Sequence, residues 1–214
     1  MTVKENLKEV LKEAEKYNPT IIAVTKYYNE DKMIEAFNAG LRNFAESRAV
    51  ESIEKINKID DTIKSQSIYH FIGHLQTNKV KYVVGFFDYI HSVDSLKVAQ
   101  CIDYEAKKQG IIQKIFLQVN NANEPQKFGI SPNDLENLIE EVKKMDSVEL
   151  VGLMNIAPLT DDVAELHRLF SNMRELKEKY NLKELSMGMS HDFKIALEEG
   201  ATMIRLGRIL FKDN

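Results

Sequence analysis

Short apolar runs alternate with amphipathic stretches from residue 20 to the end of this sequence, and the alternation constrains the fold more than any other feature. Each apolar run has the length of a buried strand, and the stretches between them have helical spacing. Eight strand-like runs can be counted: "IIAVT" (21–25), "LRNFA" (41–45), "YHFIG" (69–73), "YIHSV" (89–93), "KIFLQV" (114–119), "ELVGLM" (149–154), "KELSM" (183–187) and "TMIRL" (202–206).

The helices between these runs have recognisable ends. Asn29 can cap the helix in "EDKMIEAFNAG", and Gly40 can stop it. Thr160 precedes a long amphipathic stretch whose two leading aspartates suit a helix start, and "FKIALEEG" ends at Gly200 in the same way. Before the first strand, residues 1–17 form one more amphipathic helix, with lysine and glutamate interspersed throughout, which is not the pattern of a signal peptide.

Strands that alternate with helices pair in parallel through right-handed crossovers. Eight such units close most simply as a single (β/α)8 TIM-type barrel with an extra N-terminal helix. At 214 residues the chain is shorter than the typical ~250 of such barrels, so we expect short loops and one domain over residues 1–214. A doubly wound open sheet is the competing fold.

Composition excludes several classes of function. The net charge is -4 and the lysines are scattered among acidic residues, so the charge pattern of a nucleic-acid-binding protein is missing. No run approaches the ~20 apolar residues of a membrane span. One cysteine, Cys101, excludes an internal disulfide framework and indicates a reducing cytoplasm. Its place in a helical stretch favours a buried thiol over a reactive one.

Polar residues that follow the strands are the candidates for a functional site, because active groups of such barrels lie at the carboxyl ends of the strands. Lys26 follows the first strand and can form a Schiff base with a carbonyl, or it can simply reach solvent. Phosphate sites in barrels often use the loops after strands seven and eight. Here these loops read "GMS", ending at Ser190, and "RLGR", with Arg205 and Gly207. Together they favour an anion-binding site.

The histidines indicate no metal site and no catalytic triad. His70 and His74 are four residues apart, but no cysteine or carboxylate near them completes a ligand set. His91, His167 and His191 are dispersed along the chain, without the spacing of a nucleophile and its base.

Five blocks of the sequence resemble the pyridoxal phosphate homeostasis proteins, a family of cytoplasmic barrels similar to the N-terminal domain of alanine racemase. The blocks lie in order over nearly the whole chain, from about residue 21 to 211. They are "AVTK" (23–26), "HFIGHLQTNK" (70–79), "IHSVDSLKVA" (90–99), "GLMNIAP" (152–158) and "LSMGMSHDFKIALEEGATMIRLGRILF" (185–211). The pairing of "SMGMS" with "RLG" is the most specific part.

The resemblance implies a cofactor, pyridoxal 5′-phosphate (PLP), and a place for it. Lys26 would carry PLP as a Schiff base. Ser190, the backbone around Met189, and Gly207 would hold the phosphate, and Arg205 would face the pyridine nitrogen. An arginine cannot give that nitrogen a proton, so the ring stays a weak electron sink.

Three positions depart from the family's pattern. The second strand of the family usually ends in Gly-Glu-Asn, whereas this chain has Ser47 after Glu46. His74 stands where the family has proline, and Arg208 where a small residue is common. These departures put a contact to the edge of the ring in doubt and add a titratable group near the mouth of the site.

The predicted function is that of a PLP carrier and regulator in vitamin B6 homeostasis, without turnover of its own. We expect a cytoplasmic monomer that binds PLP, with PLP-dependent apo-enzymes as recipients and no nucleic acid or membrane as partner. One alternative is a PLP-dependent amino-acid racemase or decarboxylase, but racemases of this fold use a second domain, and only eight residues follow residue 206. Another is a Schiff-base aldolase or a phosphate-sugar isomerase on the same barrel.

Overall fold

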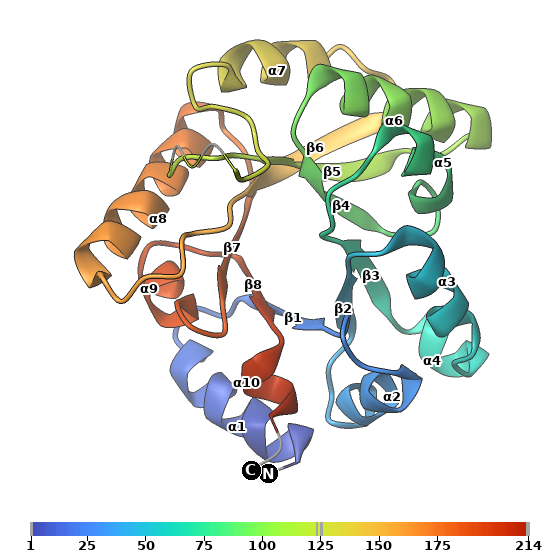
Figure 1. The fold of residues 1–214 in the computed structure, drawn as a ribbon, viewed down its shortest axis with the longest axis vertical. Coiled ribbons are helices and arrows are strands. Elements are labelled where there is room, and N and C mark those ends of the chain that lie inside the picture. Colours follow the sequence, from blue (N-terminus) through green and yellow to red (C-terminus); the bar gives the residue numbers. More distant parts are fainter. Residues whose placement is uncertain (1, 123, 125, 213–214) are drawn as a thin grey trace.

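The eight predicted strands form a closed parallel barrel, in which β8 pairs with β1 and every other strand pairs with the next along the chain. The structure is a computed structural model that describes residues 2–122, 124 and 126–212. Figure 1 shows the ring of strands with helices around its outside. The strands are β1 (Thr20–Val24), β2 (Asn43–Glu46), β3 (Ile68–Phe71), β4 (Tyr89–Val93), β5 (Gln113–Gln118), β6 (Val148–Met154), β7 (Glu184–Met189) and β8 (Met203–Leu206). The barrel prediction is confirmed, and the open sheet is excluded.

The helices follow the predicted order, and most of their ends are where the sequence places them. Asn29 caps α2 by accepting the Lys32 N–H, and the chain turns away at Gly40, where φ is +108°. The helix α8 is capped by Asp162, one of the two aspartates that suit its start, which accepts the Glu165 N–H. The helices are α1 (Val3–Ala14), α2 (Glu30–Asn38), α3 (Ala49–Asn57), α4 (Asp61–Ser65), the 3-10 turn η1 (Thr77–Lys79), α5 (Val80–Val83), α6 (Leu96–Gln109), α7 (Leu135–Val142), α8 (Val163–Lys179), α9 (Phe193–Glu198) and α10 (Arg208–Phe211).

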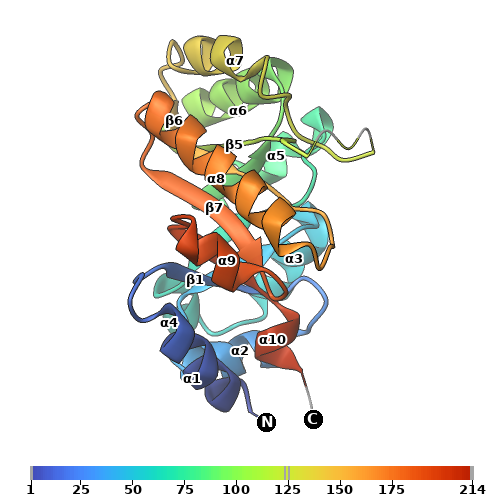
Figure 2. The ribbon, with the colours of Figure 1, turned by 90° about the vertical axis from the view of Figure 1, so that its left-hand side faces the viewer.

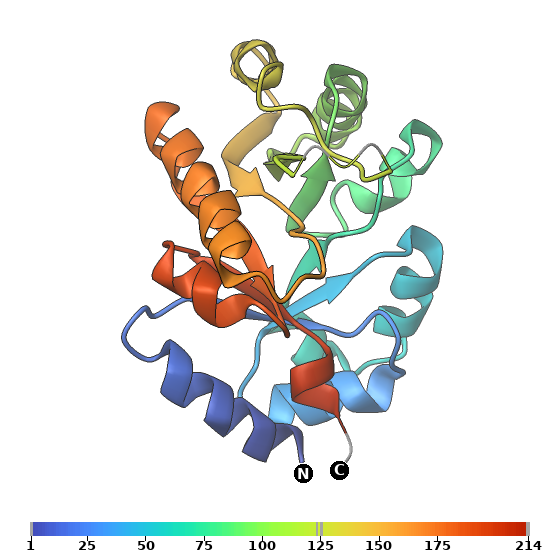
Figure 3. The ribbon, with the colours of Figure 1, turned by 60° about the vertical axis from the view of Figure 1, so that its left-hand side comes forward.

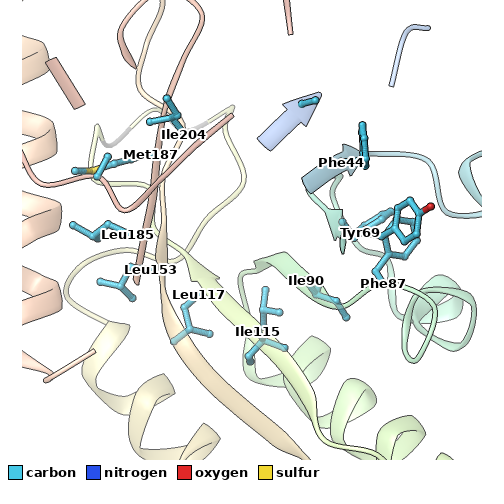
Figure 4. Close-up of a cluster of buried hydrophobic side chains, with 14 of the residues drawn as sticks. Phe44, Tyr69, Phe87, Ile90, Ile115, Leu117, Leu153, Leu185, Met187 and Ile204 are labelled. Carbon is cyan, nitrogen blue, oxygen red and sulfur yellow. The ribbon is translucent and has the colours of Figure 1, made fainter. Parts of the chain in front are cut away.

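The main core lies between the outside of the barrel and the helices. Alternate side chains of each strand point outward, and Figure 4 shows ten labelled members of this layer around the ring of strands. They come from β2 to β8 and from the segment before β4, and each is buried. The helices cover this layer, as α8 and α9 cover β7 in Figures 2 and 3. Burial of these side chains is the dominant favourable contribution to folding.

The extra helix α1 packs beside α10, so the first and last helices of the described chain lie side by side (Figures 1 and 2). The Asn6 side chain is buried between them and donates to the Leu210 carbonyl oxygen at 2.9 Å. Cys101 lies on α6, as its helical stretch predicted, but it is free and only half-buried, whereas a buried thiol was expected. No helix within the described residues has the length and apolar character of a membrane span.

The inside of the barrel holds a second, smaller apolar cluster. Its buried members are Ile22, Ala45, Phe116, Val151, Met154 and Met203. Buried polar side chains, among them His70, His91, Ser186 and Arg205, also lie inside the barrel.

Candidate functional site

A cavity of about 480 Å³ lies at the carboxyl ends of the strands, within the size range of small-ligand sites. The segments that end β1, β6, β7 and β8 contribute most of its wall. Each of the predicted site residues lines it: Lys26, Met189, Ser190, Arg205 and Gly207. The structure therefore brings together groups that are up to 181 positions apart in the sequence, from 26 to 207.

Lys26 lies in a tight turn two residues beyond the end of β1. The Tyr28 N–H closes this turn on the Thr25 carbonyl oxygen at 2.9 Å. Lys55 of α3 also stabilises this turn, because its Nζ donates to the carbonyl oxygens of Thr25 and Tyr28 at 2.9 and 3.0 Å. Within the described chain, the Nζ of Lys26 has no hydrogen bond or ion pair, and it lies 5.0 Å from the centre of the Tyr27 ring. The amine is available to a ligand.

Under this turn lies a buried carboxylate that sequence reasoning did not assign a role. Glu46 is 2% exposed and accepts from the Thr25 hydroxyl at 2.6 Å and the Ser52 hydroxyl at 3.2 Å. It also pairs with the Nζ of Lys55. Ser52 and Lys55 are one helical turn apart on α3, which is the only signal in the sequence that they act together. The network fixes β1, β2 and α3 to one another beneath Lys26.

The loops after β7 and β8 meet at Ser190. Its hydroxyl oxygen accepts from the backbone N–H groups of Gly207 and Ile209, both at 3.3 Å. The three groups therefore meet at one part of the cavity wall, which Ser190 and Gly207 line, and phosphate sites in proteins are built from such hydroxyl and N–H groups. The helices α9 and α10 have only six and four residues, so the N–H groups themselves, more than any helix dipole, favour an anion here.

Asp192 shapes the loop after β7, and sequence reasoning missed it. Its carboxylate is 3% exposed and accepts the Met189 N–H at 2.6 Å. Burial raises the pKa of Asp192, while the bond from Met189 and the positive charge of Arg205 oppose the rise. The turn also requires Gly188, where φ is +89° and a Cβ would lie 2.6 Å from the Ala196 side chain.

Arg205 forms the buried floor of the cavity. Its guanidinium is held at two points: Nη1 donates to the Ser186 hydroxyl and Nη2 to the Asn155 carbonyl oxygen, each at 2.7 Å. Burial lowers the pKa of Arg205 to about 10, and the Asp192 charge opposes this shift. A guanidinium has five N–H donors, so three remain beyond these two bonds for a ligand.

The charges around the cavity favour an anionic ligand. Lys26, Arg205 and Arg208 line it, and Asp192 is the acidic residue among the lining groups in the described chain. Arg208 is exposed and has no ion-pair partner within the described residues. A doubly charged phosphate would be attracted by this excess of positive charge.

The chain is similar in sequence to proteins of one family. The family described as the alanine racemase N-terminal domain matches residues 2–214. The pyridoxal phosphate homeostasis protein of Aquifex aeolicus is 38% identical over 199 residues, which cover 90% of this chain and 86% of that protein. The protein of the same name from Pseudomonas aeruginosa is 39% identical over 194 residues, covering 89% and 83%. This chain belongs to the pyridoxal phosphate homeostasis protein family.

Among solved structures, this chain is similar to PipY of Synechococcus elongatus, with 37% sequence identity. The matched region covers 98% of this chain and 100% of the PipY chain. The TM-score is 0.91 for PipY without PLP and 0.89 for PipY with PLP bound. The resemblance predicted from the sequence is therefore confirmed, together with the fold.

Two of the three positions that depart from the family's pattern lie outside the cavity wall. The His74 ring stacks on Phe128 at 3.6 Å between ring centres, and its Nδ1 lies 3.6 Å from the Asp94 carboxylate. Ser47 packs by its backbone against Gly73, where an added Cβ would lie only 2.0 Å from the Ser47 carbonyl oxygen. Only Arg208 reaches the cavity.

Two histidines that are far apart in the sequence meet inside the barrel. His70 and His91 are both fully buried inside the barrel, with 2.9 Å between Nδ1 of the first and Nε2 of the second. His74 is not beside them, because β3 ends at Phe71 and the chain leaves the barrel. No group of three or more potential metal ligands occurs among the described residues.

Proposed function

We propose that this protein binds PLP in the cavity at the carboxyl ends of its strands and serves PLP homeostasis, holding the cofactor on Lys26. The observation that carries the proposal is the convergence of a free amine, a buried guanidinium and a cradle of hydroxyl and N–H groups on one cavity. The names of the relatives and the PLP-bound structure of PipY support it.

The groups present fit each part of PLP. The Lys26 amine suits its aldehyde, with which it would form a C=N bond while water leaves. The Ser190 hydroxyl, with the N–H groups of Gly207 and Ile209, suits the phosphate. Near the floor, a remaining N–H of Arg205 suits the lone pair of the ring nitrogen. Met189, beside these groups, completes the wall.

We further propose that the protein is a carrier and not an enzyme. Bound PLP supplies an electron sink for amino-acid chemistry, and that sink is strongest when the ring nitrogen is protonated. Arg205 would donate to this nitrogen and could not transfer its proton at neutral pH, so it would hold the ring unprotonated. The residue at the floor thus favours retention of the cofactor over reaction.

The candidate bases in the cavity wall support the same conclusion. Racemisation needs a base within about 3 Å of the α-carbon proton on each face, and Lys26 serves one face. Among the other described lining residues, Tyr27 is 81% exposed and the Tyr28 ring packs on a phenylalanine of α10. His191 lies 3.1 Å from a backbone carbonyl oxygen, and Asp192 accepts a backbone N–H of its own turn. Tyr28, His191 and Asp192 are thus directed to other partners, and Tyr27 lies in solvent.

Loading the protein with PLP and then offering amino acids tests both parts of the proposal. We expect a visible absorbance band on loading, which an aldolase or isomerase of this fold would not show. Incubation with L-alanine, L-serine or L-lysine should then yield no more D-isomer or amine than free PLP at equal concentration. A rate several orders of magnitude above free PLP would overturn the carrier assignment in favour of a racemase or decarboxylase.

Replacing Ser190 should weaken PLP binding through the phosphate. Ser190→Ala removes a hydrogen bond to a charged group, so we expect the dissociation constant to rise about ten- to a hundredfold. Equilibrium titration followed by absorbance measures it. Ser65→Ala, an exposed serine at the end of α4, is the matched control and should bind as wild type does. Equal affinity in both variants would contradict the phosphate site.

We further propose that the PLP carrier is a cytoplasmic monomer that exchanges PLP with apo-enzymes. The single free cysteine suits a reducing compartment. At the cavity mouth, Tyr27 and Leu159 are each 81% exposed, which leaves the site accessible from outside.

A further inference from the structure

A continuous line of hydrogen bonds crosses the inside of the barrel from the floor of the cavity. It begins at Arg205 on β8, whose Nη1 lies 2.7 Å from the Ser186 hydroxyl oxygen on β7. That oxygen is 2.9 Å from Nδ1 of His91 on β4, and Nε2 of His91 is 2.9 Å from Nδ1 of His70 on β3. The line ends on β2, where Nε2 of His70 is 3.0 Å from Oδ1 of Asn43. We call these five residues the interior chain.

The members of the interior chain point into the barrel, on the opposite face of each strand from the outer core. Figure 4 labels Phe44, Tyr69, Ile90, Leu185, Met187 and Ile204 in the outer core, and each of them is adjacent in sequence to a member of the interior chain. Side chains alternate along a strand, so the residue beside each faces the lumen. The bond from His91 to Ser186 joins β4 to β7, which are not neighbours in the barrel, and so it crosses the lumen.

Aromatic rings enclose the two imidazoles. The His70 ring stacks on Tyr89 at 4.9 Å between ring centres, and the His91 ring stacks on Phe116 at 4.2 Å. Both histidines and Ser186 are 0% exposed. A buried polar group without partners would destabilise the fold, so each member depends on the bonds of the next.

The far end of the interior chain sets the direction of its protons. The Asn43 carbonyl oxygen can only accept, so Nε2 of His70 carries a proton, and a neutral His70 then accepts at Nδ1 from Nε2 of His91. A neutral His91 with its proton on Nε2 accepts at Nδ1 from the Ser186 hydroxyl. The Ser186 oxygen also accepts from Arg205, which can only donate, so the near end is compatible with the same direction.

The electrostatics of the site agree with this assignment. Burial lowers the pKa of His70 to about 3. Burial lowers the pKa of His91 as well, and the nearby His70 and the Arg205 charge add to that shift. Neutral rings can accept and donate in sequence, whereas a protonated His91 could not accept from Ser186.

We infer that Ser186, His91, His70 and Asn43 are positioning residues for Arg205: they fix the guanidinium and the direction of its hydrogen bonds, and so set the contact that it makes with the ring nitrogen of PLP. This inference rests on the proposed function. Two anchors, Ser186 and the Asn155 carbonyl oxygen, hold the guanidinium, and the interior chain polarises the first of them. The floor of the site is therefore built across five strands.

The first experiment measures which imidazole nitrogens of the interior chain are protonated in the protein without cofactor. Nitrogen-15 NMR of the imidazoles should show Nε2 protonated and Nδ1 unprotonated in both His70 and His91 at neutral pH. Addition of PLP should then shift the ring nitrogens of His91, although that residue does not line the cavity. Inorganic phosphate, which fills only the cradle at Ser190, should leave these signals in place.

The second experiment interrupts the interior chain. Ser186→Ala should abolish the PLP-induced shift at His91 and raise the PLP dissociation constant on the order of tenfold. Ser92→Ala is the matched control, since Ser92 is also buried on a strand (β4) but its hydroxyl has no bond partner among the described residues. His91→Asn, whose side-chain oxygen can still accept from Ser186, should retain more affinity than His91→Leu.

The outcomes separate the inference from the function on which it rests. If wild type binds PLP and Ser186→Ala, folded by circular dichroism, shows the same affinity and the same His91 shift, the inference is wrong. A proton on Nδ1 of His91, or a charged ring, would also overturn it, and this result is read without cofactor. If wild type does not bind PLP at all, the proposed function fails first.

Discussion

Borohydride reduction of the PLP-loaded protein is expected to fix the cofactor on Lys26, and Lys26→Ala is expected to lose the visible absorbance band completely. Among the described residues that line the cavity, Lys26 alone has an amine that can form a C=N bond with the aldehyde, and this amine has no competing hydrogen bond there. Its turn is held by Tyr28 and by Lys55, so the backbone should stay in place when the side chain is shortened. The effect is a loss of covalent attachment, not a graded change.

Peptide mapping after reduction identifies the labelled lysine, and circular dichroism shows whether the variant is folded. Lys194→Ala is a suitable control, because Lys194 lies on α9 close to the site in sequence but is exposed and paired with Glu13. It should retain the band. Label on another lysine, or an unchanged band in Lys26→Ala, would refute the assignment of the amine.

Replacing Glu46 should cost the fold about 3 kcal/mol or more of its free energy of unfolding. Glu46→Ala removes the partner of Lys55, whose side chain is only 12% exposed, and leaves that charge buried with carbonyl oxygens alone. It also leaves the Thr25 and Ser52 hydroxyls without their acceptor. Because the same network supports the Lys26 turn, slower trapping of PLP should accompany the loss of stability.

Chemical denaturation measures the free energy of unfolding, and the control is Glu54→Ala. Glu54 is a glutamate of α3, next to Lys55 in sequence, but it is exposed and has no ion pair within the described residues. Its replacement should change stability by less than about 0.5 kcal/mol. A loss of similar size in both variants would show that the buried network contributes nothing specific.

Much of the fold and several site residues could be predicted from the sequence. The alternation of apolar runs with amphipathic stretches predicted eight strands, because a buried strand and an amphipathic helix each have a local hydrophobic pattern. The rule that barrels place active groups at the carboxyl ends of strands then selected Lys26, Ser190, Arg205 and Gly207, which all line the cavity. The motifs around them predicted the family. These features depend on short segments, so the sequence alone is sufficient.

Only the tertiary structure decided which interior residues act together. Closure of the barrel, through the pairing of β8 with β1, excluded the open sheet. Closure also placed His91 within 2.9 Å of Ser186, at a separation of 95 positions in the sequence. The partners of Glu46 were likewise hidden, because they come from a strand end and from a helix whose orientation the sequence does not specify. Local patterns determine elements, whereas hydrogen bonds across a barrel depend on strand register and closure, which arise from packing of the whole chain.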